Sequence, residues 1–266
     1  MEDGTFQLTT NTVSYSLDNG ETWTELAAAT ASPVVTAGNK ILWKGELTPS
    51  SSYGVGTFSA TGNFDVQGNV MSLLYGDNYK GQTDLTGKDY AFSQLFYNNT
   101  KVVNAEGLSL PATTLANYCY ILMFYGCTSL TTAPELPATT LAYATGCYSY
   151  MFNGCTSLVN APVLPATTLA NSCYDGMFKN CTSLTTAPEL PVKTLTNNCY
   201  QYMFQGCTNL NYIKAMFTTT PSTTYTRNWV SGVAATGTFV KNSAAQWNVT
   251  GISGIPNGWT VQTASA

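Results

Sequence analysis

The chain has 266 residues, of which 44% are hydrophobic and only 9% are charged, and its formal net charge at pH 7 is −4. A typical soluble domain is about 25% charged, so uncharged polar side chains must make up most of the surface. Arg227 is the one arginine and no basic cluster occurs, which argues against a nucleic-acid partner. Histidine is absent, which excludes Ser-His and Cys-His catalytic pairs and zinc sites that use histidine.

Residues 1–75 are expected to form a small all-β domain, because apolar residues alternate with polar ones there. The alternating apolar residues are Phe6 and Leu8, then Val13, Tyr15 and Leu17, then Ile41 and Trp43. The turn Asp18-Asn19-Gly20 predicts a tight hairpin between two of these strands.

Residues 16–23, SLDNGETW, resemble the Asp-box of sialidases and other glycan-active proteins. The resemblance implies a structural hairpin that lies away from any reaction centre. A sialidase also needs several arginines to hold the substrate carboxylate, whereas this chain has Arg227 alone. We therefore interpret the Asp-box as a structural element.

Residues 76–89 are rich in Gly, Asp and Lys and are interpreted as a connector, after which the sequence becomes repetitive. The repeats read CYILMFYGCTSL from Cys119, CYSYMFNGCTSL from Cys147, CYDGMFKNCTSL from Cys173 and CYQYMFQGCTNL from Cys199. A degenerate copy around Phe92 precedes them, so residues 90–217 hold about five copies. A fixed period of 26 to 28 residues indicates stacked repeats. Residues 218–266 are expected to form a C-terminal β cap.

Each repeat carries apolar residues four positions apart, such as Cys119, Met123 and Cys127. Rows at i, i+4 lie on one face of a helix, so the pattern predicts about three helical turns that end at Gly126. A short extended piece follows, and Pro134 stops it because proline cannot donate to a sheet. One short strand and one short helix per repeat predict an α/β fold, a right-handed leucine-rich-repeat solenoid.

The eight cysteines occupy two positions of the repeat and are assigned a structural role. They are Cys119, Cys127, Cys147, Cys155, Cys173, Cys181, Cys199 and Cys207. Eight residues of helix span about 12 Å, whereas bridged Cα atoms lie within about 7 Å, so pairing inside a repeat is excluded. We predict two columns of buried thiols, and bridges between neighbouring copies stay open.

The repeats are similar to BspA-like leucine-rich-repeat surface proteins of gut-anaerobe, Bacteroides-type bacteria. The similarity covers about residues 90–217 and rests on Met-Phe in place of the family's Ala-Phe, then Gly-Cys-Thr-Ser-Leu and a terminal Leu-Pro. Proline and alanine stand where the family has branched apolar residues, so the strand of each repeat is expected to be shorter than in the family. The resemblance implies a cell-surface or secreted protein that adheres to a ligand.

The functional prediction is a non-enzymatic, monomeric binding protein for a protein or glycan of unknown identity, without cofactor, metal, nucleic acid or membrane insertion. The predicted contact surface consists of outward positions that vary between copies: Tyr118, Tyr125, Tyr150, Asn153, Lys179, Tyr202 and Gln205. Rich in Tyr and Asn, it has the composition of adaptable binders. A threonine-rich strand face is the competing surface.

Three other functions stay open at this point. One is a receptor-binding or tail-associated module of a phage or prophage, and another is a passive spacer. The third is a glycan-processing enzyme, which needs two facing carboxylates. Glu135 and Glu189 share a position two repeats apart and are the one candidate pair.

Overall fold

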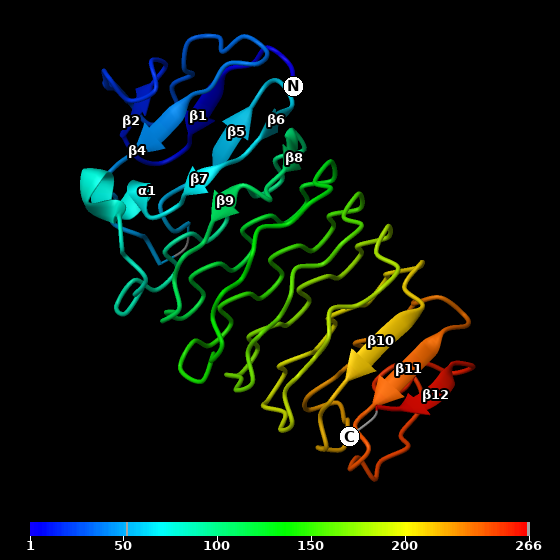
Figure 1. The fold of residues 1–266 in the computed structure, drawn as a ribbon. Helices are drawn as coiled ribbons and strands as arrows, with labels where there is room; N and C mark the ends of the chain where they lie inside the picture. The colour runs from blue at the N-terminus through cyan, green and yellow to red at the C-terminus, as the bar shows by residue number, and fades with distance from the viewer. Residues whose placement is uncertain (52, 265–266) are drawn as a thin grey trace.

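The structure is a computed structural model that describes residues 1–51 and 53–264. Short strands joined by long runs of turns make up the described chain, with one α-helix and one 3₁₀ helix (Figure 1). The strands are β1 (Phe6–Leu8), β2 (Val13–Ser16), β3 (Thr24–Leu26), β4 (Leu42–Lys44), β5 (Phe58–Ala60), β6 (Phe64–Asp65), β7 (Gly68–Asn69), β8 (Val102–Asn104), β9 (Leu108–Ser109), β10 (Tyr212–Ala215), β11 (Thr238–Lys241) and β12 (Thr260–Thr263). The helices are α1 (Ser72–Tyr75) and the 3₁₀ helix η1 (Gly76–Tyr79).

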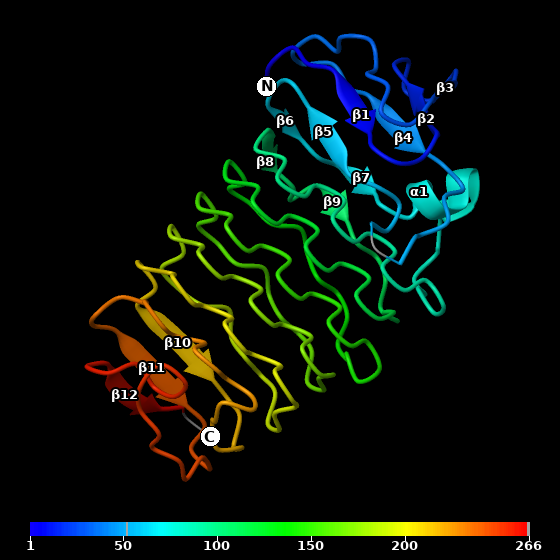
Figure 2. The same cartoon turned by 180° about the vertical axis from the view of Figure 1, so that it is seen from behind.

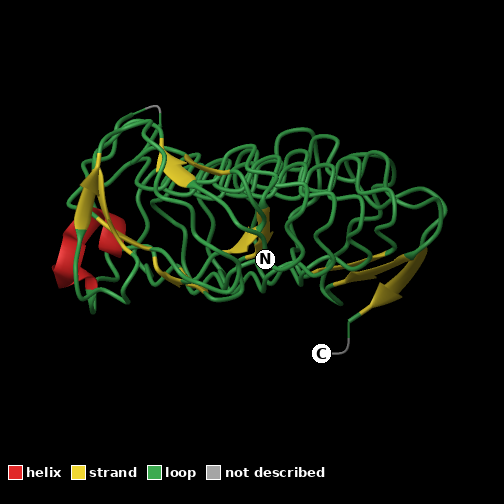
Figure 3. Ribbon diagram, turned by 90° about the horizontal axis from the view of Figure 1, so that it is seen from above, coloured by secondary structure: helices red, strands yellow, loops and turns green. Residues whose placement is uncertain are grey.

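The repeated copies lie one on another as successive coils of the chain (Figures 1 and 2). Parallel bridges join equivalent positions of neighbouring coils, such as Thr132 with Asn160 and Thr140 with Thr168. The extended piece after each Thr-Ser-Leu is therefore reduced, in the middle coils, to single bridging residues. Figure 3 shows the coils side by side between the N-terminal sheets and the strands β10 to β12.

The predicted α/β leucine-rich-repeat solenoid is wrong, because the described repeats contain no helix. The α-helix α1 is four residues long and precedes the repeats. Where a helix was expected, residues 118–127 form consecutive turns. Every fourth residue of this segment has a positive φ: 55° at Tyr118, 58° at Leu122 and 69° at Gly126. A continuous right-handed helix cannot pass through such residues.

The backbone hydrogen bonds show how these turns are held in place. The amide of Met123 donates to the carbonyl of Tyr120 three residues earlier, whereas the amide of Phe124 donates at 2.9 Å to Met151 in the next coil. This alternation continues along the segment and recurs in the following coils. In a helix, each residue at i+4 is rotated by about 40° around the axis relative to residue i. The turns here repeat every four residues, so that buried pairs such as Met123 and Phe124 all face the core. We call this arrangement of residues 90–99, 118–127, 146–155, 172–181, 198–207 and 224–232 the turn ladder.

Buried side chains of the turn ladder stack in columns through the molecule. One column of rings runs from Phe92 through Tyr120 and Tyr148 to Tyr174, with centroids 5.6 to 5.9 Å apart. Met123, Met151, Met177 and Met203 are fully buried beside it. Burial of this apolar surface in one continuous core holds the coils together.

The N-terminal region contains the strands that alternation predicts, and β1, β2 and β4 confirm them. β2 pairs antiparallel with β3 through the Asp18-Asn19-Gly20 turn and with β4 on its other side. β1 pairs antiparallel with β5. Since β6 and β7 pair in parallel with β8 and β9, this region continues directly into the first coil.

At the C-terminal end, β10, β11 and β12 form one parallel sheet in that order. β11 and β12 lie within residues 218–266, where a β cap was expected, whereas Trp229 lies in a turn. The buried rings of Phe217, Trp229 and Phe239 close the core at this end. The last two residues of the predicted cap lie outside the described residues.

Candidate functional site

The outer surface of the turn ladder carries most of the predicted contact residues. In residues 118–127 the buried positions are Cys119, Tyr120, Met123, Phe124 and Cys127. The residues between them face outward and are partly exposed. Because the amides of these residues bond alternately within the coil and to the next coil, the outward side chains project from an ordered backbone.

Large side chains of one coil cover glycines of the next along this surface. The ring of Tyr118 lies over Gly146, and the ring of Tyr150 lies over Gly176, so that a Cβ at either glycine would collide with the ring. Both glycines have positive φ, 60° and 58°. At these two places the variation between copies, from which the surface was predicted, reflects packing: Tyr118 and Tyr150 each lie over a glycine of the next coil.

Six of the seven predicted contact residues are partly exposed, namely Tyr118, Tyr125, Tyr150, Lys179, Tyr202 and Gln205. The prediction is wrong for Asn153, whose side chain is only 6% exposed. Tyr125 stacks on Tyr97 and Tyr118 stacks on Tyr90, each pair with ring centroids 4.9 Å apart.

A grouping of polar and aromatic side chains surrounds Asp175. Gln201 donates through Nε2 to Asp175 Oδ2 at 3.2 Å, and Lys179 Nζ lies 5.4 Å from the centre of the Tyr202 ring. The hydroxyl of Tyr150 lies near enough to lower the pKa of the Asp175 carboxyl, although Oδ1 is buried without a hydrogen-bond partner. We call Tyr150, Asp175, Lys179, Gln201 and Tyr202 the Asp175 cluster.

Burial dominates the electrostatics of the Asp175 cluster. It raises the pKa of Asp175 to about 6, although the hydrogen bond from Gln201, the nearby Tyr150 hydroxyl and the charge of Lys179 lower it. Burial, followed by the neighbouring Asp175 carboxylate, raises the pKa of Tyr150. Tyr150 therefore stays a neutral hydroxyl at neutral pH, and Asp175 changes charge in the mildly acidic range.

Asp175 and Gln201 were identified from the sequence as outward, variable positions but were left out of the predicted contact set. Both occupy the position that Ile121 and Ser149 hold in earlier coils. The change from serine to aspartate to glutamine along the column was the available signal.

The cysteines line the interior and are all buried and unbridged. The thiols of Cys127, Cys155, Cys181 and Cys207 donate to backbone carbonyls of the preceding coil at 2.9 to 3.1 Å, as between Cys127 and Phe96. Burial raises the pKa of Cys127 and Cys207 to about 12. Because the thiolate is the reactive form, these groups act as small hydrophobic side chains.

The alternative carboxylate pair lies on the surface, where Glu135 and Glu189 are exposed. Glu189 forms an ion pair with Lys214 at 3.0 Å. Val163, 78% exposed, occupies the same position of the coil between them. Two coils correspond to roughly 10 Å along the stack, so this arrangement lacks the close facing of a retaining acid–base pair.

The Asp-box forms the hairpin that was predicted from its sequence. Ser16 Oγ bonds to Asp18 Oδ1 at 2.6 Å, and Trp23 Nε1 donates to the carbonyl of Gly20 at 3.1 Å. Hydrogen bonds from Ser16 and Thr22 hold the pKa of Asp18 well below its usual range. All of these polar groups are used within the hairpin itself.

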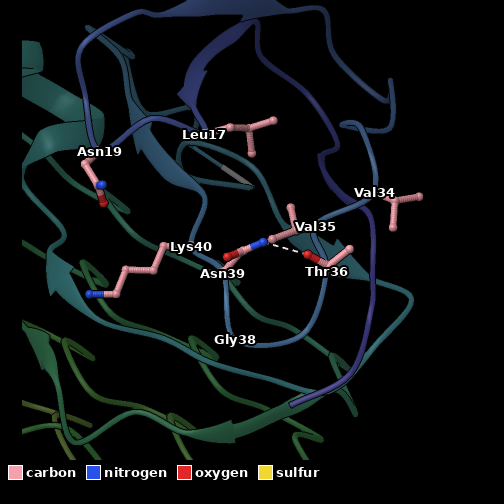
Figure 4. A pocket seen from close by; sticks show the side chains of 8 residues that line it. All are labelled: Leu17, Asn19, Val34, Val35, Thr36, Gly38, Asn39 and Lys40. Carbon is pink, nitrogen blue, oxygen red and sulfur yellow. Dashed lines mark hydrogen bonds between the residues drawn. The ribbon is translucent and has the colours of Figure 1, made fainter.

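A hollow of about 370 Å³ lies beside this hairpin, and Figure 4 shows the side chains around it. Leu17 and Asn19 contribute from the hairpin, and residues 34–40 form the opposite wall. Asn39 donates to Thr36 Oγ1 at 2.6 Å, which consumes two of the polar groups. The side chains diverge in the view, and the hollow lacks the convergent polar groups of a ligand site.

No family model, curated protein or solved structure matches the chain. The resemblance to BspA-like proteins therefore stays a prediction. In the described part of the chain, no helix is long and apolar enough to cross a membrane. The same residues contain no group of three side chains suited to hold a metal ion.

Proposed function

We propose that this chain is a non-enzymatic binding protein, displayed at a cell surface or secreted, which adheres to a host protein or glycan. The observation that supports the proposal is the set of partly exposed tyrosines on the turn ladder, Tyr118, Tyr125, Tyr150 and Tyr202, with Asp175, Lys179 and Gln201 among them. Tyrosine supplies a large contact area with two side-chain torsions, and polar neighbours fix orientation.

The restricted positions of these side chains favour a binding surface over a passive spacer. Stacking of Tyr125 on Tyr97, at 4.9 Å, restricts the ring before any ligand arrives. The Lys179 ammonium beside Tyr202 does the same for that ring. A side chain that is already ordered loses less conformational entropy on binding. This preorganisation distinguishes the surface from a simple solubilising cover.

The test is a binding screen of the purified chain against a glycan array and a panel of extracellular-matrix proteins. We expect a specific ligand whose affinity falls at least about tenfold in a Tyr150→Asn, Tyr202→Asn double variant. Asparagine tolerates the positive φ at both positions, as Asn228 does at the equivalent position of a later coil. Tyr212→Ala, in β10, is the control, because this half-exposed tyrosine lies on the strand side of the coil.

Binding that survives the double variant and fails in Tyr212→Ala would move the site to the strand side. Silence across both panels would contradict the proposal.

A further inference from the structure

Among the described strands, β12 (Thr260–Thr263) has an open edge. It pairs with β11 on one side, and in the part of the chain that the structure describes no strand pairs with its other side. All four residues from Thr260 to Thr263 are exposed, and none of them carries a charge. Figure 1 shows β12 at the outer rim of its sheet. An unprotected edge of this kind is a template for pairing with another strand.

The opposite end of the molecule protects its edges. The outer side of β1 is covered by residues 29–35, where Ser32 donates to the carbonyl of Phe6 at 2.7 Å and Gly4 exchanges hydrogen bonds with Val35. The edge strand β3 carries Glu25, an exposed charge of the kind that opposes strand pairing. β12 has neither a cover nor a charge.

The hydrogen bonds of β12 identify which of its backbone groups point outward. Thr260 donates to Gly237 at 2.9 Å, and Ala264 donates to Lys241 at 2.8 Å, both toward β11. In a parallel pair, alternate residues bond to the same neighbour. Val261 and Thr263 therefore direct their amide and carbonyl groups away from β11, to the open side.

We propose that two copies of this chain pair through β12, antiparallel about a two-fold axis that passes at Gln262. In this register Val261 lies opposite Thr263 of the second copy, and Gln262 lies opposite its own counterpart. Hydrogen-bonded and non-bonded pairs alternate in an antiparallel ladder, so the four outward groups of each strand all find partners.

A second copy fits this edge because the register is self-complementary, as a two-fold interface requires. No charge faces its own copy across the axis, and two glutamine amides can bond to each other. The contact extends the existing β10–β11–β12 sheet. With about four backbone hydrogen bonds the affinity is modest, in the micromolar range or weaker, so that the monomer expected from the sequence is the form at low concentration.

Sedimentation velocity of the full chain between about 10 μM and 1 mM tests the association. We expect the wild-type chain to shift from monomer toward dimer. Val261→Pro removes an outward donor and leaves the bonds of Thr260 and Ala264 to β11 in place, and it should stay monomeric. Val261→Thr keeps that donor and should dimerise like the wild type. A wild-type chain that stays monomeric throughout would overturn the proposal.

Oxidative cross-linking tests the register. All eight native cysteines are buried, so a cysteine introduced on β12 is the accessible thiol. Gln262→Cys places two Cβ atoms about 4.5–5.5 Å apart across the axis, near the separation of a disulfide. Thr260→Cys is the control, because its counterpart lies four residues away, about 13 Å. We expect about tenfold more cross-linked dimer from Gln262→Cys, and equal yields would overturn the register.

Discussion

The N-terminal β region and the turn ladder carry apolar patterns of equal clarity, but only one pattern has the structure that its period suggests. The period of two in β1, β2 and β4 gives strands. The period of four around Met123 and Phe124 gives turns whose amides bond alternately within the coil and to the next coil. A helix would have to supply carbonyl acceptors for its amides from within its own segment. A stacked repeat instead offers carbonyl acceptors in the next coil, so that a period of four can be met by turns.

The largest expected effect comes from placing a charge in each region. Met151→Asp puts a carboxylate where the native side chain is fully buried in the stacked core, and we predict a loss of more than about 4 kcal/mol or failure to fold. Tyr15→Asp, in the half-buried strand β2, should cost only about 1–3 kcal/mol. Urea denaturation measures both. Equal losses would contradict the continuous buried core of the repeats.

Substitutions of the turn glycines are expected to cause losses of stability of intermediate size. Gly176→Ala combines a positive φ of 58° with a collision against the Tyr150 ring, and we predict a loss of about 3 kcal/mol. At Gly154 the nearest contact for an added Cβ is 3.6 Å away, so Gly154→Ala should cost only the backbone strain of about 1 kcal/mol. Thermal unfolding of both variants checks the difference. A larger loss at Gly154 would show that the tyrosine does not cover Gly176.

Two aspartates give the smallest effects, with opposite signs in the two regions. Burial raises the pKa of Asp175 from 3.8 to about 6, so its contribution to stability is fully present below about pH 4 and is lost as the pH rises through 6. Asp175→Asn should therefore be more stable than the wild type at pH 7 by about 1 kcal/mol after allowance for solvent screening, with the gain vanishing near pH 4.

Hydrogen bonds from Ser16 and Thr22 lower the pKa of Asp18 instead, so its contribution is present above about pH 4 and falls in acid. Asp18→Asn should destabilise the chain at pH 7 and lose this effect at low pH. Urea unfolding across pH 3–8 compares the two variants. Parallel pH profiles would contradict the assigned environments.

The sequence was sufficient for the strands near Phe6, Val13 and Trp43 and for the Asp-box hairpin, because alternation and an Asn-Gly turn are local signals. It was not sufficient for the turn ladder. Rows of residues such as Cys119, Met123 and Cys127 satisfy both a helix and a four-residue turn, and the acceptor in the next coil is invisible in a single copy.

The candidate surface shows the same limit. The outward tyrosines could be identified from their variation between copies, and most of them are partly exposed. Asn153 was misplaced, since the turn ladder buries its side chain. The surroundings of Asp175 come from side chains in the adjacent coils, Tyr150 and Gln201. Such contacts join residues about 26 positions apart, and they depend on how the coils stack, which the sequence of one repeat does not show.

The most direct test of the turn ladder is the acceptor of one buried amide. Tyr148 donates to the carbonyl of Cys173 in the next coil at 3.0 Å, whereas in a helix it would donate to Ala144, four residues earlier. Scalar coupling across the hydrogen bond, measured by NMR on deuterated, labelled protein, identifies the carbonyl. We predict a coupling between the Tyr148 amide and the Cys173 carbonyl. A coupling to the carbonyl of Ala144 would contradict the turn ladder and restore a helix in each repeat.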